Sequence, residues 1–151
     1  MPELTASTVP ARSPSRSGEF YRWQAPSHDL AVEIQLDVID RLDREVVQTF
    51  RAITSRGSET GGLLLGFWRE KPDAAIVITD YEAVPCDYRR GPLYLLTEEE
   101  QRRLEEAVLR HRSSSDPERR VVGFFRSNTR KELMLDDDDV AILKRYFAEF
   151  P

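Results

Sequence analysis

The residue types that do chemistry are concentrated around position 127 and in a run of carboxylates. Ser127 would act as a nucleophile only with a base beside it, and the triplet Arg126-Ser127-Asn128 contains no histidine. Asp136–Asp139 would suit a divalent cation, but carboxylates are also favoured at a helix N-terminus, where they cap the helix and meet its dipole. The run lacks the loop spacing of an EF-hand calcium site. We therefore expect Asp136–Asp139 to open a helix.

Glu59 is the other candidate, because it stands just before two glycines in Glu59-Thr60-Gly61-Gly62. One interpretation makes Glu59 part of a site, and the other makes it an ordinary turn residue at the surface ahead of a strand. The glycines indicate close packing or a positive φ rather than phosphate binding, because the sequence has no Gly-rich loop ending in Lys-Ser/Thr.

Metal ligands are scarce in this chain. Its only histidines are His28 and His111, and its only cysteine is Cys86. A structural zinc site needs four such ligands, and a three-ligand site would need these three separate segments to converge. Cys86 has only Arg89 or Arg90 nearby to lower its pKa, so a nucleophilic role has little support. The sequence predicts neither a bound metal nor a cofactor.

The totals indicate one soluble globular domain plus a tail. The chain has 151 residues, of which 40% are hydrophobic and 32% charged, and its net charge is -5. The negative charge argues against general binding to nucleic acid or to an anionic membrane. We see no apolar run long enough to span a membrane and no secretory signal, and a single cysteine allows no intrachain disulfide. These observations favour a cytoplasmic protein.

The elements that must position these residues follow the order β-α-β-β-α-β-α, which predicts an α/β (α+β) fold with a mixed sheet flanked by helices. Thr97 and Glu100 form a capping box ahead of the second helix. The strands at 62–68 and 74–84 are expected to pair as a hairpin. The predicted strands are 31–36, 62–68, 74–84 and 120–125, with a brief one at 93–96, and the helices are 37–56, 97–111 and 136–150.

Residues 1–27 are predicted to be a disordered or loosely packed N-terminal tail, and 28–151 the domain. Residues 1–19 are rich in Ser, Thr, Pro and Arg and have no apolar periodicity, so they cannot bury enough surface to offset their ordering entropy. Phe20, Tyr21 and Trp23 are expected to pack on the domain edge, and a partner-binding motif is the alternative.

Two segments together resemble the MPN/JAB (Mov34, JAMM-type) family. They are Glu59-Thr60-Gly61-Gly62-Leu63-Leu64-Leu65-Gly66, and Val122-Gly123-Phe124-Phe125-Arg126-Ser127-Asn128 with the later Leu135–Asp139. Active members show Glu-x-Gly-Gly-x-Leu-x-Gly, then His-Ser-His-Pro, then Leu-Ser-x-x-Asp. The resemblance covers about residues 30–150. It implies a cytidine-deaminase-like sheet, usually continued by one or two more strands that are missing here, so either the chain is a fragment or another chain completes the sheet edge.

The resemblance also implies roles for single positions. In active members two histidines and the aspartate bind zinc, the glutamate is the general base on the zinc-bound water, and the serine steadies the tetrahedral intermediate during isopeptide hydrolysis. Carried over, Glu59 is the base, Ser127 the serine and Asp139 the carboxylate ligand. Arg126 and Asn128 replace the histidines. In addition, Thr129 stands for the proline and Asp136 for the second serine, and the loop before Asp139 is shorter than the family spacing.

These replacements oppose zinc binding. Residues i and i+2 of an extended segment point the same way, so positions 126 and 128 both face the expected metal position. Arginine has no lone pair and stays protonated. At ~4 Å and an effective dielectric of ~20, two like unit charges repel by about 4 kcal/mol, and a dication roughly doubles that. We expect Arg126 instead to occupy the position and to pair with Asp139 or Glu59, because buried carboxylates need a partner.

The sequence therefore predicts a non-catalytic MPN/JAB-like domain, a pseudoenzyme that acts by protein binding or scaffolding. The resemblance implies a protein partner, either another MPN-like domain or a larger assembly, and a homo-oligomer stays open. One alternative is a metallo-isopeptidase with a ligand set drawn from Glu59, Asn128, Asp136 and Asp139. The other is an anion-binding module built on Arg126 with Arg130 and Lys131.

Overall fold

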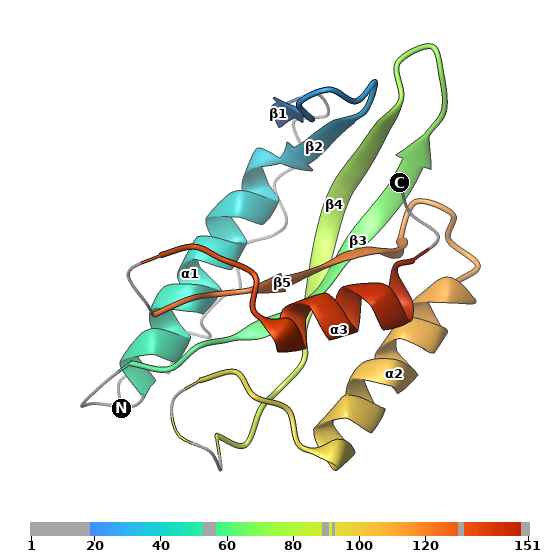
Figure 1. The fold of residues 1–151 in the computed structure, drawn as a ribbon. Helices are drawn as coiled ribbons and strands as arrows, with labels where there is room; N and C mark the ends of the chain where they lie inside the picture. Colours follow the sequence, from blue (N-terminus) through green and yellow to red (C-terminus); the bar gives the residue numbers. More distant parts are fainter. Residues whose placement is uncertain (1–18, 53–56, 89–90, 92, 130–131, 149–151) are drawn as a thin grey trace, which may run out of the picture.

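A five-stranded mixed sheet with strand order β1-β2-β4-β3-β5 forms the centre of the molecule (Figure 1). The computed structural model describes residues 19–52, 57–88, 91, 93–129 and 132–148. The expected α/β class, with helices flanking a mixed sheet, is confirmed. The elements are β1 (Phe20–Gln24), β2 (Ala31–Gln35), α1 (Leu36–Ala52), β3 (Gly61–Arg69), β4 (Ala75–Ala83), α2 (Glu98–Arg112), β5 (Arg120–Arg126) and α3 (Asp137–Tyr146).

The sheet is mixed because β2 pairs in parallel with β4, while the other neighbours are antiparallel. The predicted hairpin of β3 and β4 is confirmed, with Gly62 opposite Ala83 and Arg69 opposite Ala75. β3 also pairs with β5, so it has a strand on each side. Its continuous apolar sequence fits that central place, because both of its faces are buried.

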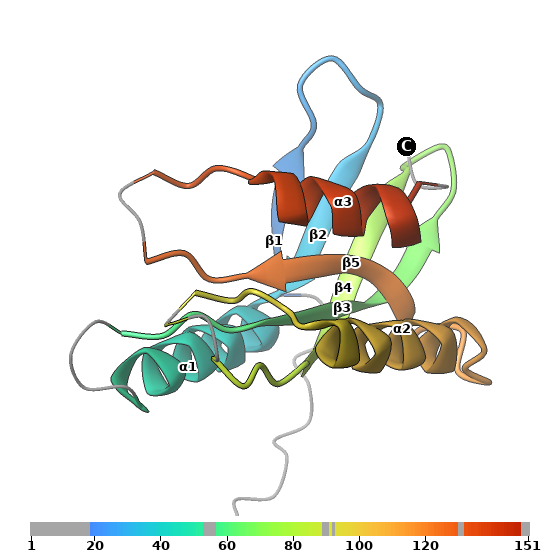
Figure 2. The ribbon, with the colours of Figure 1, turned by 60° about the horizontal axis from the view of Figure 1, so that its bottom comes forward.

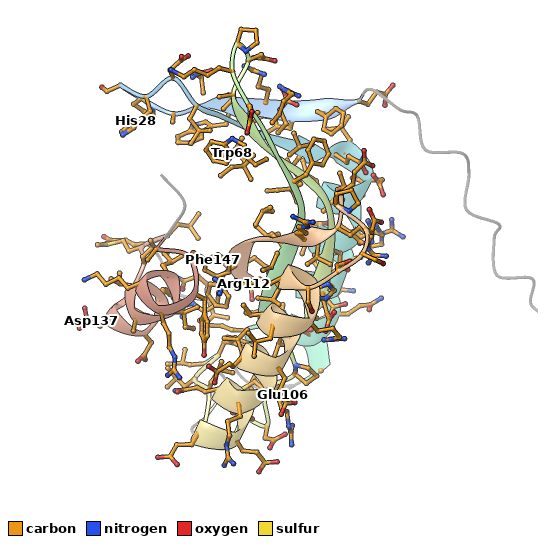
Figure 3. The ribbon with its side chains drawn as sticks, turned by 90° about the vertical axis from the view of Figure 1, so that its right-hand side faces the viewer. His28, Trp68, Glu106, Arg112, Asp137 and Phe147 are labelled. Atoms are coloured by element: carbon orange, nitrogen blue, oxygen red, sulfur yellow. The ribbon has the colours of Figure 1, made fainter. Side chains whose placement is uncertain are left out.

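Helices cover both faces of the sheet. Val38 of α1 packs with Ile78 and Val122 on one face. On the other face, Leu104 of α2 and Phe147 at the end of α3 join a core cluster that contains Leu63 and Leu65 of β3 and Val121 of β5. Figure 3 shows α1 and α3 on opposite sides of the curved sheet. Neighbouring residues of β3 therefore alternate between two separate cores.

β1 is a strand that the sequence analysis did not predict. Residues 20–24, assigned there to the tail, pair antiparallel with β2, from Phe20 opposite Gln35 to Gln24 opposite Ala31. Phe20 packs against a small core cluster, whereas Tyr21 and Trp23 are about half exposed. Packing at the domain edge is thus confirmed for Phe20, whereas Tyr21 and Trp23 lie exposed on the edge strand. Residues 1–18 of the expected tail lie outside the described residues.

The brief strand predicted at 93–96 is wrong. Residues 93–97 have no regular secondary structure and pair with no strand. The backbone N–H of Tyr94 donates instead to the carboxylate of Glu59 at 3.0 Å. The Tyr94 hydroxyl donates to the carbonyl of Val84 at 2.6 Å. The buried Glu59 carboxylate therefore accepts the hydrogen bond that the backbone carbonyl of a neighbouring strand would otherwise accept.

The helix starts follow the predicted caps in two of three cases. Thr97 and Glu100 form the expected capping box of α2, and Asp136 and Asp139 form one at α3. α1 begins at Leu36, one residue before the start that was predicted for this helix at residue 37. α1 is described to Ala52, and its predicted end near 56 lies outside the described residues. α3 ends at Tyr146, short of the predicted 150, because Phe147 is the C-cap.

Gly61 and Gly62 are required by close approach. A Cβ on Gly62 would lie 2.1 Å from the carbonyl oxygen of Glu82, and one on Gly61 would lie 2.5 Å from the Tyr94 ring. Neither glycine has a positive φ. The close packing predicted for this pair is confirmed, and it brings Tyr94 up to the start of β3. No helix in the described part of the chain is long and apolar enough to cross a membrane.

Candidate functional site

Glu59 is fully buried, with 0% of its side chain exposed, so its interpretation as a surface turn residue is wrong. Its Oε2 accepts from the N–H of Tyr94 at 3.0 Å. Its Oε1 accepts from the N–H of Thr129 at 3.1 Å and from the Thr129 hydroxyl at 3.2 Å. Its backbone carbonyl accepts from the hydroxyl of Tyr88. Glu59 therefore joins segments that are 29 to 70 positions away along the chain.

Arg126 lies beside Glu59 because of strand register. β5 pairs antiparallel with β3 so that Arg126 is opposite Gly61, two residues after Glu59. The start of α3 approaches from the same side and supplies two more carboxylates. Nη1 of Arg126 lies 3.3 Å from Oε2 of Glu59, and Nη2 lies 2.6 Å from Oδ2 of Asp139 and 3.2 Å from Oδ2 of Asp136. The pairing predicted for Arg126 is confirmed with both expected carboxylates.

The cluster is largely withdrawn from solvent. The exposed fractions of the side chains are 7% for Arg126, 4% for Asp139 and 26% for Asp136. One guanidinium thus faces three carboxylates, and N–H and O–H donors also bind Oε1 of Glu59 and Oδ1 of Asp136. Within the described residues, every buried side-chain nitrogen or oxygen has a hydrogen-bond partner. A buried charge group of this kind is tolerated only when its members are paired in this way.

Asp139 serves two structures at once. Its Oδ2 accepts from the backbone N–H of Asp136 at 3.0 Å, which completes the capping box of α3, and also from Arg126 at 2.6 Å. Asp136 in turn accepts from the N–H of Asp139 at 2.9 Å. The helix start and the ion cluster therefore share a carboxylate oxygen, so the orientation of α3 is coupled to Arg126.

Ser127 and Asn128 have positions that differ from the roles implied by the family resemblance. The Ser127 hydroxyl accepts from the N–H of Thr60 at 2.9 Å, and the Ser127 N–H donates to the carbonyl of Thr60 at 2.8 Å. These bonds extend the pairing of β3 and β5. The Asn128 amide nitrogen donates to the carbonyl of Glu132 at 3.1 Å, within the loop that follows.

The residues present do not fit the zinc that the family resemblance implies. Arg126 puts a cation with no lone pair against the carboxylates that would face a metal. Asn128 offers at best an amide oxygen, which is a poor zinc ligand. Among the described residues, no group of three or more His, Cys, Asp or Glu side chains is arranged to hold a metal. Oxygen ligands alone would suit a harder cation than zinc.

Three residues at this site were not predicted from the sequence. Tyr88, Tyr94 and Thr129 all donate to Glu59. Burial raises the pKa of the Tyr94 and Tyr88 hydroxyls above their usual range, so both stay protonated and able to donate. Tyr94 was predicted to lie in a brief strand and Thr129 to stand for the family's proline, and no sequence pattern singled out Tyr88.

The scarce metal-ligating residues are placed apart. His28 lies in the connection between β1 and β2, His111 in the last turn of α2, and Cys86 in the core under α2. His111 bonds to Glu82. Burial raises the pKa of the Cys86 thiol, which opposes a nucleophilic role.

Comparisons of this chain with models of known protein families and with curated proteins gave no match.

Proposed function

We propose that this chain is a non-catalytic, MPN/JAB-like domain that works by binding or scaffolding proteins. The single observation that carries the proposal is the placement of the Arg126 guanidinium against Glu59 and Asp139. In the family resemblance these two positions belong to the general base and to a zinc ligand. A guanidinium there takes up the carboxylates that the hydrolytic reaction would need.

Support for the family assignment comes from the motif residues and from the order of the elements. Glu59 and the two glycines begin the central strand, the Arg-Ser-Asn triplet ends β5, and an aspartate opens the helix after it. The three segments converge on one cluster, as they would if the motif residues shared a site. Convergence of residues 59, 126 and 139 is difficult to explain by chance similarity of short strings.

The anion-binding alternative receives no support from this geometry. The Arg126 guanidinium is 7% exposed and faces three carboxylates, so it presents no net positive charge to a ligand. Its proposed companions Arg130 and Lys131 lie outside the described residues.

Metal analysis combined with a cleavage assay tests the proposal. Protein purified with zinc present should contain far less than one zinc per chain, and it should not cleave an isopeptide-linked conjugate of ubiquitin or a ubiquitin-like protein. Chelation with EDTA should leave the melting temperature unchanged. Stoichiometric zinc together with turnover would overturn the proposal and favour the metallo-isopeptidase alternative.

A variant designed to bind zinc provides a test in which the expected result is a gain of zinc binding. Arg126→His combined with Asn128→His supplies two imidazoles and removes the cation, so zinc should now raise the melting temperature by mass action. The control is Lys71→His with Arg102→His, which adds two histidines at exposed positions in separate segments, the β3–β4 connection and α2. Light scattering of the purified chain reports whether the binding partner includes a second copy.

A further inference from the structure

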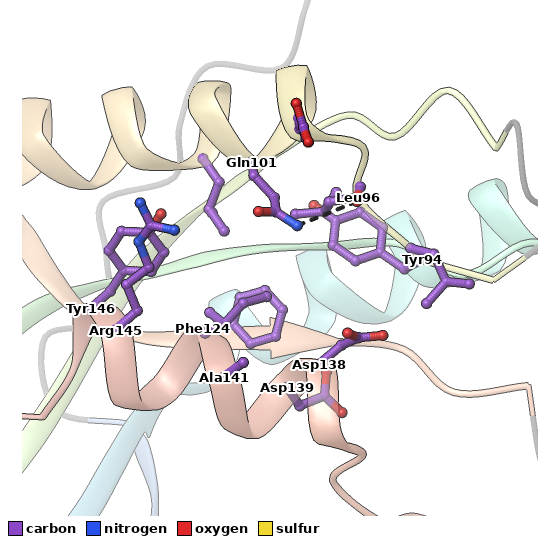
Figure 4. Close-up of a pocket in the computed structure, with 13 residues that line it drawn as sticks. Tyr94, Leu96, Gln101, Phe124, Asp138, Asp139, Ala141, Arg145 and Tyr146 are labelled. Atoms are coloured by element: carbon purple, nitrogen blue, oxygen red, sulfur yellow. Dashed lines mark hydrogen bonds between the residues drawn. The ribbon is translucent and has the colours of Figure 1, made fainter.

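A groove runs between α2 and α3 on the face of the sheet opposite α1. Figure 2 shows the two helices on either side of β5, and Figure 4 shows Phe124 of β5 between Gln101 of α2 and Ala141 of α3. The groove has a volume of about 200 Å³. Leu96, Leu104 and Ile142 add apolar surface around Phe124. The groove therefore has an apolar floor around Phe124, helices as its walls, and polar and charged side chains along them.

The size of the groove limits what it can hold. Pockets that bury small-molecule ligands or cofactors have volumes of roughly 300–1,000 Å³. The groove is smaller than that range, but it has room for one long side chain. A segment of a partner protein that inserts a single side chain fits this volume better than a cofactor does.

The charges at the groove select the type of side chain. Glu98 in the first turn of α2 and Asp138 in the first turn of α3 both line it. Neither carboxylate has a hydrogen bond or ion pair with another described residue. Asp139, the third acidic residue in the lining, is already paired with Arg126.

Among the described residues that line the groove, the single cation, Arg145, does not cancel these charges. Arg145 lies with Tyr146 at the end of the groove away from Asp138 (Figure 4). Its guanidinium is 3.6 Å from a carboxylate oxygen of Glu105 and stacks over the Tyr146 ring. The end near Asp138 and Leu96 thus combines an apolar floor with two carboxylates that pair with no described residue.

We propose that the groove binds a lysine or arginine side chain of a partner protein, an inference that rests on the proposed protein-binding function. The apolar stem of such a side chain would lie along Phe124 and Ile142, and its charged head would reach Glu98 and Asp138. Lysine and arginine bury their methylene stems on apolar surface while the charged head stays in a polar setting, and this groove offers both environments.

Titration of the whole, isotope-labelled chain with blocked dipeptides tests the inference by NMR. The probes are acetyl-Leu-Lys-amide and acetyl-Leu-Arg-amide. The comparison peptides carry norleucine, which keeps the stem without the charge, or glutamate. The lysine or arginine peptide should shift the amide signals of Gln101, Ala141 and Ile142, with a dissociation constant on the order of 1 mM. Binding should weaken as salt is raised, because exposed charges are screened.

Matched substitutions locate the effect. Asp138→Asn and Glu98→Gln should each weaken binding of the basic peptide about two- to fivefold, as expected for a partly exposed ion pair. Asp137→Asn changes a neighbouring first-turn aspartate that does not line the groove, and it should leave binding unchanged. Ala141→Leu should block the groove and abolish the shifts, with circular dichroism checking that the variant is folded.

Three results would overturn the inference: absence of any shift with the basic peptides, equal binding of the norleucine or glutamate peptide, or an equal loss with Asp137→Asn. None of these three results bears on the proposed function. The proposed function is tested by zinc content and isopeptide cleavage, whereas the groove is tested by peptide titration, with different variants and a different readout.

Discussion

Arg126 holds a positive charge among three carboxylates in a place where water has little access. The arrangement is stable because each charge has a partner within hydrogen-bond reach or close to it, from 2.6 to 3.3 Å. A buried pair of this kind adds little stability compared with well-packed apolar residues, but removal of one member leaves its partners uncompensated. The cluster is therefore sensitive to loss of the arginine in particular.

Replacement of Arg126 by methionine should lower the free energy of unfolding by about 3–5 kcal/mol, because Glu59 and Asp139 would stay buried without a cation. Urea unfolding monitored by circular dichroism measures the change. Arg110→Met is the control, since Arg110 is 61% exposed and pairs with Glu82 at the surface, and its effect should stay within about 0.5 kcal/mol. Equal effects of the two substitutions would contradict the role given to the cluster.

The central residues of this cluster were predictable from the sequence, and its periphery was not. The motif resemblance placed Glu59, Arg126 and Asp139 together, and the need of buried carboxylates for a partner predicted the ion pairs. Tyr94 and Thr129 donate through backbone N–H groups, and any residue type except proline has such a group. Residue identity therefore carries no signal for these two backbone bonds, which depend on how the chain turns in three dimensions; only the added bond from the Thr129 hydroxyl depends on residue type.

At the scale of elements, β3 is packed so closely that its three glycines, Gly61, Gly62 and Gly66, have no room for a side chain. Gly62 approaches the backbone of β4, and backbone cannot move aside as a flexible side chain can. The approach is part of the register that brings β5, and with it Arg126, alongside the start of β3.

Gly62→Ala should therefore destabilise the fold by about 1–3 kcal/mol, the usual cost of forcing extra volume into a packed interior. Gly123→Ala on β5 is the matched control, because its new Cβ would lie 3.4 Å from a Leu64 methyl carbon, near ordinary contact distance. Thermal unfolding of both variants gives the comparison. If Gly123→Ala proves as damaging as Gly62→Ala, close approach to β4 is not the reason for the glycine.

Local pattern predicted most elements and failed where pairing is long-range. The hairpin of β3 and β4, the capping box at Thr97 and the helix opened by Asp136–Asp139 depend on near neighbours, and all three are confirmed. β1 has the sequence FYRWQ, with three aromatics in five residues, and it is a strand only because β2 is available to pair with it. The parallel pairing of β2 with β4 likewise joins segments separated by a helix and a strand, which no local window contains.

At the scale of the whole molecule, ion pairs between side chains of β1, β2 and β3 connect the strands at the end of the sheet away from α2 and α3. Glu33 of β2 accepts from Arg69 of β3 at 2.9 and 3.0 Å and from Arg22 of β1, and both arginines also pair with Asp73. This network lies over the small residues Ala31 and Ala75, which are fully buried. Figure 3 shows His28 and Trp68 at this end, away from α2 and α3.

The network gives the stability of the protein a dependence on pH. Hydrogen bonds from Arg69 and Arg22 hold the pKa of Glu33 below its ordinary value of 4.5, although burial opposes them. The unfolded state then binds more protons in the window between the lowered pKa and 4.5, so the contribution of Glu33 is present above that window and is lost as the pH falls through it.

Urea unfolding of the natural chain and of Glu33→Gln should therefore differ most near neutral pH and converge as the pH falls through the lowered pKa of Glu33. Glu70→Gln provides the control, because Glu70 is exposed and has no ion pair with a described residue. A difference between the natural chain and Glu33→Gln that stays constant with pH would contradict the assignment.

The hydrogen bond from the Tyr94 N–H to Glu59 has a kinetic consequence for the segment between β4 and α2. This amide can exchange its proton with water only when the buried carboxylate of Glu59 is released, which disturbs β3 and β5 together. We expect the Tyr94 amide to exchange as slowly as those of β3, although it lies outside any helix or strand. Gly91, an exposed residue whose N–H bonds to the carbonyl of Tyr88, should exchange quickly. Similar rates for Tyr94 and Gly91 would show that the connection opens by itself; slow exchange at Tyr94 would mean that a stretch without regular structure opens only together with the sheet.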